Sequence, residues 1–534
     1  MRDDDRAAGS LTEEPAYEAS AGSPPPRRRS LTNVGGEIET SGDPAAAALL
    51  AHAIDVAPSM DEGADDRAHV HGFHAYPARA HPVTARRLVE ALVPPSGTVL
   101  DPFCGSGTVI IEAMLAGRAA IGSDLNPVAV MLARAKTYPR TLEKTTALVA
   151  AARGVAAHAE ARRKAKAGAS RRLPQEDVSL FPPHVLLELD GLRAGIAEAA
   201  PELRPDLSLV LSSILVKLSP RRGDTSEEQT DKRIAAGYAS RLFVRKTEEL
   251  ARRFDDFALL LRKAACSTEP GQDDALDATG IGSPDAAATP DSAVAAAGNA
   301  VTADSAAIGD STVDATADAA TAAADSTAAA DSTADADSTA ATDSTADAAS
   351  RTAAGSRGVT AARPRVRVWE DDANVLKRVA DGSVDAVITS PPYVATYDYL
   401  QHHELRMRWL GLDPRKLARG EIGARRRYER LSVREAVASW EHELAKLFHS
   451  LARVMKPGAP LVLLIADSAA GRGPGGERAE PIRADEVVAR VAARDRELVP
   501  IARASQARPH FHGPTQRAFA GRPRFEHALL LRRA

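Results

Sequence analysis

The chain has 534 residues, with 68 Lys or Arg against 72 Asp or Glu, and its formal net charge at pH 7 is −4. Its two cysteines, Cys104 and Cys266, are too few for a disulfide framework or a Cys-rich zinc site, which excludes a secreted disulfide-stapled scaffold and predicts a cytoplasmic location. The sequence predicts no signal peptide, and no apolar run approaches the ~18 residues of a membrane-spanning helix.

Residues 1–68 are predicted to form a disordered tail. They contain the run Pro-Pro-Pro-Arg-Arg-Arg and almost no aromatic residues, so they offer too little apolar surface to offset the entropy of ordering. The arginine triplet could contact nucleic acid or could be an ordinary solvated charge run.

Residues 69–140 contain a strand, a glycine-rich turn, a helix and a second strand. The apolar run 98–101 enters the turn, residues 109–115 have helical spacing, and residues 119–124 are a second apolar run. This order is typical of a nucleotide- or cofactor-binding half of an α/β domain.

The turn reads Asp101-Pro-Phe-Cys-Gly-Ser-Gly-Thr108. Gly105 and Gly107 allow the backbone to bend sharply, and a helix that begins near Thr108 directs its free N–H groups toward a ligand. Asp124 ends the next strand, where a carboxylate can accept both hydroxyls of a ribose. The alternative is a tight turn without a ligand.

The same turn distinguishes between cofactors. A dinucleotide site requires a third glycine, and that position is Ile110. Asp101 and Phe103 are better suited to a ligand that carries an amino acid moiety.

Residues 141–264 are helical by pattern, most clearly at 184–200 and 243–263, and predict an inserted helical subdomain. Residues 265–362 consist mainly of Ala, Asp, Ser and Thr, and the tetrad Asp-Ser-Thr-Ala recurs every six residues from Asp325. This composition predicts a flexible acidic linker. Without its 16 acidic residues the net charge of −4 becomes +12, so the remainder is basic.

Residues 363–534 alternate strands and helices. The predicted strands are 365–369, 384–389, 461–466 and 526–532, and the predicted helix is 440–455. Together with residues 69–140 they predict an α/β fold with a mostly parallel, Rossmann-like sheet covered on both faces, in which the last strand belongs to an antiparallel edge hairpin. Long disordered segments and the helical insert complete the predicted organisation.

A second motif, Thr389-Ser-Pro-Pro-Tyr393, directly follows one of these strands. Its two prolines cannot donate hydrogen bonds and fix the backbone, so the carbonyls of Ser390 and Pro391 form a stiff arc of acceptors that suits an exocyclic amino group. Pro392 continues that arc, and Tyr393 offers a ring on which a flat base could stack. The alternative is a plain Pro-Pro turn.

The two motifs together resemble those of the amino-directed, S-adenosylmethionine-dependent DNA methyltransferases, over residues 69–140 and 363–534. The resemblance implies that the first motif holds S-adenosylmethionine and that the second holds the amino group of a DNA base. In that family a serine at the position of Ser390 usually accompanies cytosine N4 methylation, whereas Asp or Asn usually accompanies other amino targets. Cytosine N4 is therefore favoured over adenine N6.

Further residues match the family by position. The segment His74-Ala-Tyr-Pro-Ala-Arg79 resembles the one that packs over the methionine end of the cofactor, and Asp372 resembles the acid that meets the adenine amino group. Both have structural alternatives, since His74 could be a packing residue and Asp372 a loop cap.

The order of the motifs implies that residues 141–264 recognise the target DNA. A loop in this insert carries Arg221 and Arg222, and the cluster 415–430 has seven Lys or Arg against two Glu. Such arginines can contact phosphate or read guanine, or they can be solvated. The candidates in the second cluster are Arg425, Arg426 and Arg427. The acidic linker departs from the family pattern.

The predicted reaction is a direct methyl transfer to a neutral amine without a covalent enzyme intermediate. Neither cysteine follows a proline, as a carbon-directed cytosine methyltransferase would require, so Cys104 is interpreted as a packing residue. The rival hypotheses are an RNA amino methyltransferase, which usually has Asp before Pro-Pro-Tyr, a DNA-binding protein without catalysis and, least favoured, a nicotinamide dehydrogenase. DNA is the expected partner, no membrane is involved, and a cognate restriction nuclease is a candidate partner.

Overall fold

The computed structural model describes residues 36–56, 67–77, 79–221, 232–267, 365–471, 479–508, 518–519 and 521–534. The predicted disordered tail over residues 1–35 and 57–66 and the predicted acidic linker over residues 268–362 lie outside these residues.

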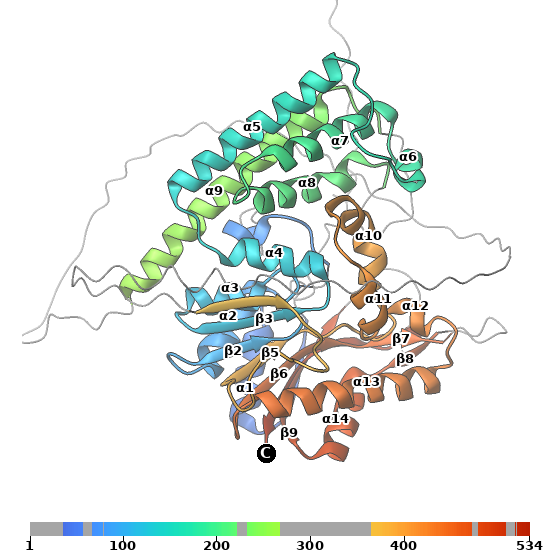
Figure 1. The fold of residues 1–534 in the computed structure, drawn as a ribbon. Helices are drawn as coiled ribbons and strands as arrows, with labels where there is room; N and C mark the ends of the chain where they lie inside the picture. Colours follow the sequence, from blue (N-terminus) through green and yellow to red (C-terminus); the bar gives the residue numbers. More distant parts are fainter. Residues whose placement is uncertain are drawn as a thin grey trace, which may run out of the picture. The chain divides into compact units, whose positions relative to one another are not determined.

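A single eight-stranded sheet organises the described chain (Figure 1). Its strand order is β1-β9-β10-β6-β5-β2-β3-β4, in which the five strands from β6 to β4 are parallel and the rest are antiparallel. The strands are β1 (Ile38–Gly42), β2 (Thr98–Asp101), β3 (Ala119–Asp124), β4 (Val366–Glu370), β5 (Ala386–Thr389), β6 (Pro460–Ala466), β9 (Leu498–Arg508) and β10 (Arg524–Arg533). A short pair, β7 (Ser468–Ala470) and β8 (Glu480–Ile482), forms a second sheet. The predicted α/β class with a mostly parallel, Rossmann-like sheet is confirmed.

The two faces of the sheet follow from the alternation of side chains along each strand. In β2, Val99 packs into one hydrophobic cluster and Leu100 into another, and in β6 Val462 and Leu463 divide in the same way. Successive residues of a strand point to opposite faces, so continuous apolar runs indicate strands that are buried on both sides.

Helices cover both faces. One cluster includes α1 (Pro44–Ile54), α2 (Pro82–Leu92) and α3 (Thr108–Leu115), and the other includes α13 (Val433–Val454) and α14 (Ala484–Asp495). Helix α13 begins seven residues before its predicted start, where Ser432 and Glu435 form a reciprocal capping box.

The predicted antiparallel hairpin that contains the last strand is present as β9 and β10, and β1 extends the sheet beyond it. Strand β10 pairs with both β6 and β9, and β1 pairs with the outer side of β9. Residues 525–531 of β10 are all buried, as expected for an interior strand that has a neighbour on each side.

The prediction of disorder is wrong for residues 36–56. They form β1 and α1, and α1 packs on β9 and β10. The helix is initiated by Asp43, whose side chain accepts from the backbone N–H of Ala46, and by Pro44 at its first position. The segment lacks aromatic residues, but its small side chains can pack closely on a sheet that the rest of the chain has already formed.

Replacing Leu50 with alanine should therefore destabilise the fold. Leu50 is buried in α1, and the loss of a buried leucine typically costs about 2–5 kcal/mol. The free energy of unfolding in urea measures the loss, with Leu49→Ala as the control because Leu49 is only partly buried. If each variant lowered the free energy of unfolding by less than about 0.5 kcal/mol, this would show that α1 does not pack on the sheet.

A helical insert follows the first half of the sheet. It comprises α5 (Leu142–Lys164), α6 (Gln175–Leu180), α7 (Pro183–Glu198), α8 (Arg204–Leu218) and α9 (Tyr238–Ser267). These helices share one hydrophobic cluster with α4 (Pro127–Thr137) and α10 (Tyr399–Leu410), and α8 contacts both α4 and α10 (Figure 1). Short helices at His69–Gly72, Arg415–Gly420 and Arg425–Tyr428 complete the described elements. Among the described residues, no helix has the length and apolar character needed to cross a membrane.

Candidate active site

A cleft of about 800 Å³ lies beyond the carboxyl ends of β2, β3 and β5. This edge of an open α/β sheet is where ligands usually bind. Eight of the predicted site residues line it, namely Asp101, Phe103, Gly105, Thr108, Asp124, Asp372, Ser390 and Pro392. The fold thus brings both sequence motifs into one cleft, although 288 residues separate Asp101 from Thr389.

Asp101 joins the two motifs directly. Its Oδ1 accepts from the Thr389 hydroxyl at 2.7 Å and from the backbone N–H of Phe103 at 3.2 Å. Burial raises the pKa of Asp101 to about 7, and these hydrogen bonds oppose the shift. The carboxyl group therefore titrates close to neutral pH.

Asp124 shapes the glycine-rich turn from the end of β3. One of its oxygens accepts from the backbone N–H of Gly105 at 2.9 Å, and the other accepts from that of Asn126 at 2.8 Å. Burial raises the pKa of Asp124 to about 6, so the carboxylate is mostly ionised at neutral pH. It remains partly accessible and can accept further hydrogen bonds from a ligand in the cleft.

The two glycines of the turn have different tasks. Gly105 has a φ of +50°, and a β-carbon on it would lie 2.9 Å from Cε1 of Tyr76. Gly107 does not line the cleft; it has a φ of +88° and caps the N-terminus of α3. The first glycine therefore allows an aromatic ring to cover the turn, and the second begins the helix.

His74, predicted to bind the cofactor, is not among the residues that line the cleft. Its Nε2 shares a hydrogen bond of 2.9 Å with the Ser212 hydroxyl on α8, and burial keeps its pKa well below the usual range. The residue connects its segment to the helical insert, which is the packing role that the sequence left open. Tyr76 and Arg79 of the same segment do line the cleft, and the ring of Tyr76 stacks on His403 at 5.1 Å. From the sequence, the aromatic Tyr76 could have been chosen as the cofactor-binding candidate of this segment instead of His74.

Asp372 caps its loop and lines the cleft, and its contact with an adenine amino group stays a prediction. Its Oδ1 accepts from the backbone N–H of Asn374 at 2.9 Å, which caps the loop after β4, and the residue also lines the cleft. Leu125 and Gly420 lie close to it, because a β-carbon on Gly420 would be 2.6 Å from Leu125 and 3.7 Å from the Asp372 carboxylate.

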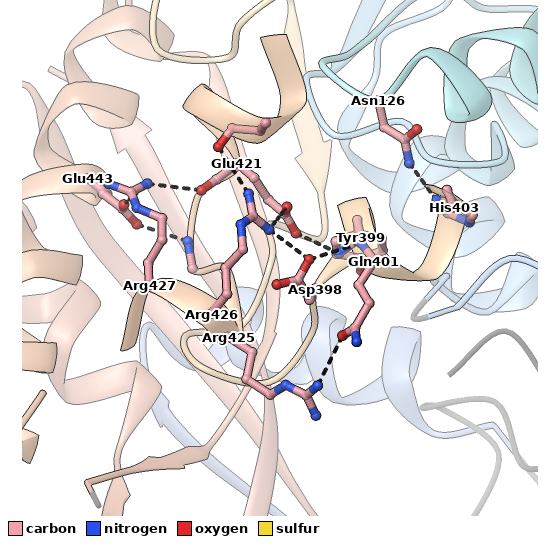
Figure 2. Close-up of polar contacts among 12 residues, drawn as sticks. Asn126, Asp398, Tyr399, Gln401, His403, Glu421, Arg425, Arg426, Arg427 and Glu443 are labelled. Carbon is pink, nitrogen blue, oxygen red and sulfur yellow. Dashed lines mark hydrogen bonds and ion pairs between the residues drawn. The ribbon is translucent and has the colours of Figure 1, made fainter. Parts of the chain in front are cut away.

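The segment 415–430 forms part of the cleft wall and is held by ion pairs (Figure 2). Glu421 lines the cleft; it accepts from the backbone N–H of Tyr399 at 2.7 Å and from Arg426 at 2.6 Å. Arg426 also donates to Asp398 at 2.7 Å. Sequence reasoning missed Tyr399 and Glu421, because neither belongs to a motif.

The three predicted DNA-contacting arginines of this segment therefore differ. Arg426 is engaged with Asp398 and Glu421, and Arg427 contacts Glu443 at 2.9 Å and the Glu421 carbonyl at 3.1 Å (Figure 2). Arg425 donates to Gln401 at 3.2 Å, and its side chain is 46% exposed. The structure thus holds Arg426 between two carboxylates, whereas the side chains of Arg425 and Arg427 are 46% and 45% exposed.

The structure describes only one of the two predicted DNA-contacting arginines of the helical insert. Arg221 donates its backbone N–H to the Ser219 hydroxyl, and its carbonyl accepts from Lys232. Arg222 lies outside the described residues.

The Thr389–Tyr393 motif lies where two cavities meet. Ser390 lines the main cleft and also a smaller cavity, which Tyr393 lines as well, whereas Pro391 lines neither. The Tyr393 side chain shares a hydrogen bond with Ser390, and burial raises its pKa above the usual range. Tyr393 is 4% exposed and lines the smaller cavity, and the stacking of a base on its ring stays a prediction.

Comparisons with known proteins agree with the cofactor side of the cleft. Residues 57–135 match the model of a family described as DNA methylase. The type II methyltransferase M.MvaI of Kocuria varians is 38% identical over 72 residues, which are 13% of this chain and 16% of that protein. M.MjaII of Methanocaldococcus jannaschii is 30% identical over 76 residues, 14% of each chain, and M.BsoBI of Geobacillus stearothermophilus is 46% identical over 44 residues, 8% and 9%.

These matches span at most 16% of the length of the three relatives. The family match over residues 57–135 includes the glycine-rich turn and Asp124, and it confirms the predicted resemblance at the first motif.

Proposed function

Because residues 57–135 match the model of a DNA methylase family, we propose that this chain transfers a methyl group from S-adenosylmethionine to an exocyclic amino group of a DNA base. The observation that carries the proposal is the position of Ser390, which stands after β5 between the cofactor-side cleft and a second cavity. A methyl donor on one side and an acceptor amine on the other could meet at that residue.

The groups that line the cleft fit S-adenosylmethionine. Asp124 would accept the two ribose hydroxyls, and Asp372 would accept from the adenine amino group between Leu125 and Gly420. Asp101, with its carboxyl group beside Phe103, would bind the ammonium group of the methionine end. When bound, the cofactor supplies a methyl carbon made electrophilic by a positively charged sulfur.

The acceptor side needs hydrogen-bond acceptors and does not need a strong base. The Ser390 hydroxyl and the adjacent carbonyls would accept the hydrogens of the amino group, which polarises the nitrogen and orients it. The proton leaves late, to solvent. Cys104 is buried and burial raises the pKa of its thiol, so it takes no part as a nucleophile.

Cytosine N4 is the proposed target because the motif begins with Ser390 and lacks Asp or Asn at that position. We also propose that the helical insert recognises the DNA and that Arg425, whose side chain remains exposed, contacts phosphate. A cognate restriction nuclease is a proposed partner, by analogy with the type II systems that the names of the relatives describe.

The test incubates purified protein and labelled S-adenosylmethionine with unmethylated DNA or with total RNA, and identifies the product nucleoside by mass spectrometry. Wild-type protein should form N4-methylcytosine in DNA. Ser390→Ala should lower the rate by about 100-fold, in the range seen when one preorganised hydrogen-bonding group is lost, without changing cofactor affinity.

Ser383→Ala is the matched control, because Ser383 lies before β5 and bonds only to a local carbonyl, that of Ala380. If the product were N6-methyladenine, the assignment to the amino-directed DNA methyltransferases would stand, but the target base would be adenine and not cytosine. Label found only in RNA would favour the RNA methyltransferase, and cofactor binding without any methylation would favour the non-catalytic DNA-binding protein.

A further inference from the structure

A second, smaller cavity adjoins the cleft, and its empty volume of about 370 Å³ includes space that is open to solvent. Ser390, Arg79 and Ala80 line both spaces. The walls that belong only to the smaller cavity come from α1, the Thr389–Tyr393 motif and strands β6, β9 and β10, and they are Ile54, Tyr393, Leu464, Ile465, Gln506, Arg508, Glu526 and His527. Half of these residues are polar or charged, which is unusual so deep in a fold.

Two of the polar residues have hydrogen-bonding groups without a partner in the described part of the chain. Arg508 is 5% exposed, and its Nε donates to Glu526 at 2.8 Å, but its Nη1 has no partner there. Gln506 is fully buried, and its amide contacts the Gly36 carbonyl at 3.3 Å while its Oε1 has no partner there. Buried polar groups are nearly always satisfied, so two such atoms on one cavity point to a ligand.

The strand register holds these groups together. Glu526 on β10 lies opposite Gln506 on β9 and Ala466 on β6. Burial raises the pKa of Glu526, and Arg508 opposes that rise. The fourth polar residue, His527, is already engaged, since its ring contacts the Ser505 hydroxyl and Asp467. The cavity therefore offers one fixed cationic donor, one carboxylate and one amide.

We propose that Arg508, positioned by Glu526, donates through Nη1 to the ring nitrogen N3 and the carbonyl O2 of a cytosine whose amino group lies at Ser390. This inference rests on the proposed function and names the residues that select the base. The amino group, N3 and O2 of cytosine lie along one edge, and the last two are acceptors. The corresponding edge of adenine has an amino group and N1, followed by a C–H that accepts nothing.

The selectivity follows from the cost of an unpaired donor. A site built to donate to a substrate oxygen discriminates strongly against an analogue without that oxygen, because the buried donor is then left without a partner. An arginine suits this task because its planar guanidinium presents several donors in a fixed geometry. The guanidinium of Arg508 uses Nε for Glu526, and its Nη1, which has no partner in the described part of the chain, is left for the base.

The experiment compares three variants of the full chain with wild type, using unmethylated plasmid DNA and S-adenosylmethionine. Arg508→Lys keeps the charge beside Glu526 but removes the fork of donors, and it should lower kcat/KM for DNA by about 10- to 100-fold. The double variant R508M/E526M removes the whole buried pair and should reduce methylation at least as much. Replacing both partners of a buried ion pair with apolar residues usually preserves folding, so this variant controls for instability.

Arg532→Met is the matched control, because Arg532 is an exposed arginine on the same strand as Glu526 and donates to the Gly458 carbonyl. All variants should bind S-adenosylmethionine with the affinity of wild type, measured by calorimetry. In a duplex that carries 2-thiocytosine at the methylated position, sulfur, a weak acceptor, replaces O2. Wild type should therefore be less active on this duplex than on unmodified DNA. Arg508→Lys, which has already lost the contact to O2, should show little further loss between the two duplexes.

Unchanged kcat/KM in both Arg508 variants would overturn the inference and would mean that the cavity holds only water. N6-methyladenine as the wild-type product would also overturn it, while the proposed methyltransferase function would stand. A wild-type protein that methylates no DNA would instead refute the proposed function itself, so the two failures are distinguishable.

Discussion

Replacing Gly105 with alanine is expected to weaken the binding of S-adenosylmethionine by about 100-fold or more. The backbone of Gly105 has a φ of +50°, which costs an alanine roughly 1–2 kcal/mol, and its new β-carbon would lie 2.9 Å from Cε1 of Tyr76. The ring of Tyr76 cannot move away easily, since it stacks on His403 and its hydroxyl meets the amide of Asn126. The turn that contacts the cofactor would therefore be displaced.

Gly117→Ala separates the two causes of this loss. Gly117 also has a positive φ, of +71°, but a β-carbon there would meet no atom within 4 Å. This control should lose stability by a similar 1–2 kcal/mol and bind the cofactor as wild type does. Calorimetric titration with S-adenosylmethionine measures the affinity, and thermal melting measures the stability. If the two variants bound the cofactor equally well, the contact between Gly105 and Tyr76 would not shape the site.

The affinity for S-adenosylmethionine should fall about tenfold between pH 8 and pH 6. The cofactor carries positive charge, which an ionised Asp101 attracts, and burial raises the pKa of Asp101 to about 7, so about nine tenths of it is protonated at pH 6. Asp101→Asn should bind weakly at pH 8 and lose at most about twofold more at pH 6. That remaining change would come from Asp124, whose pKa is about 6. Calorimetry at several pH values gives both curves, and parallel curves would exclude Asp101 from the contact.

The same carboxyl group should affect the stability of the unliganded protein in the opposite direction. The folded-state pKa of Asp101, about 7, lies above its ordinary value of 3.8, so the protonated form stabilises the fold. This contribution is fully present below about pH 3.8 and disappears as the pH rises through about 7, with a slope of about 1.4 kcal/mol per pH unit in between. Asp124 contributes with the same sign, so the difference between wild type and Asp101→Asn isolates Asp101. Urea unfolding at pH 4.5 and 6.5 measures it.

The sequence alone determined the parallel half of the sheet and the cofactor side of the cleft. Strand β2, the glycine-rich turn, α3 and β3 are consecutive, and each is specified by a local pattern of apolar runs, glycines and caps. Parallel strands bring their carboxyl ends to one edge, so the same logic placed Ser390 beside Asp101 across nearly 290 residues. Local pattern and sheet topology were sufficient because each motif residue directly follows its own strand.

Only the tertiary structure decided the features that depend on pairs of distant side chains. The N-terminal segment is ordered because Ile38 pairs with Gln506 in the sheet, and His74 faces Ser212 because a helical insert packs on its segment. Arg426 is held by Asp398 and Glu421, a partnership that a count of basic residues cannot foresee.

The cavity beside Ser390 has the same origin. Arg508 and Glu526 meet because the register of two antiparallel strands places them together, and in the sequence they are only polar residues within or beside apolar runs. Strand register and side-chain pairing arise from the packing of the whole chain, whereas a turn or a helix cap is specified by a few adjacent residues.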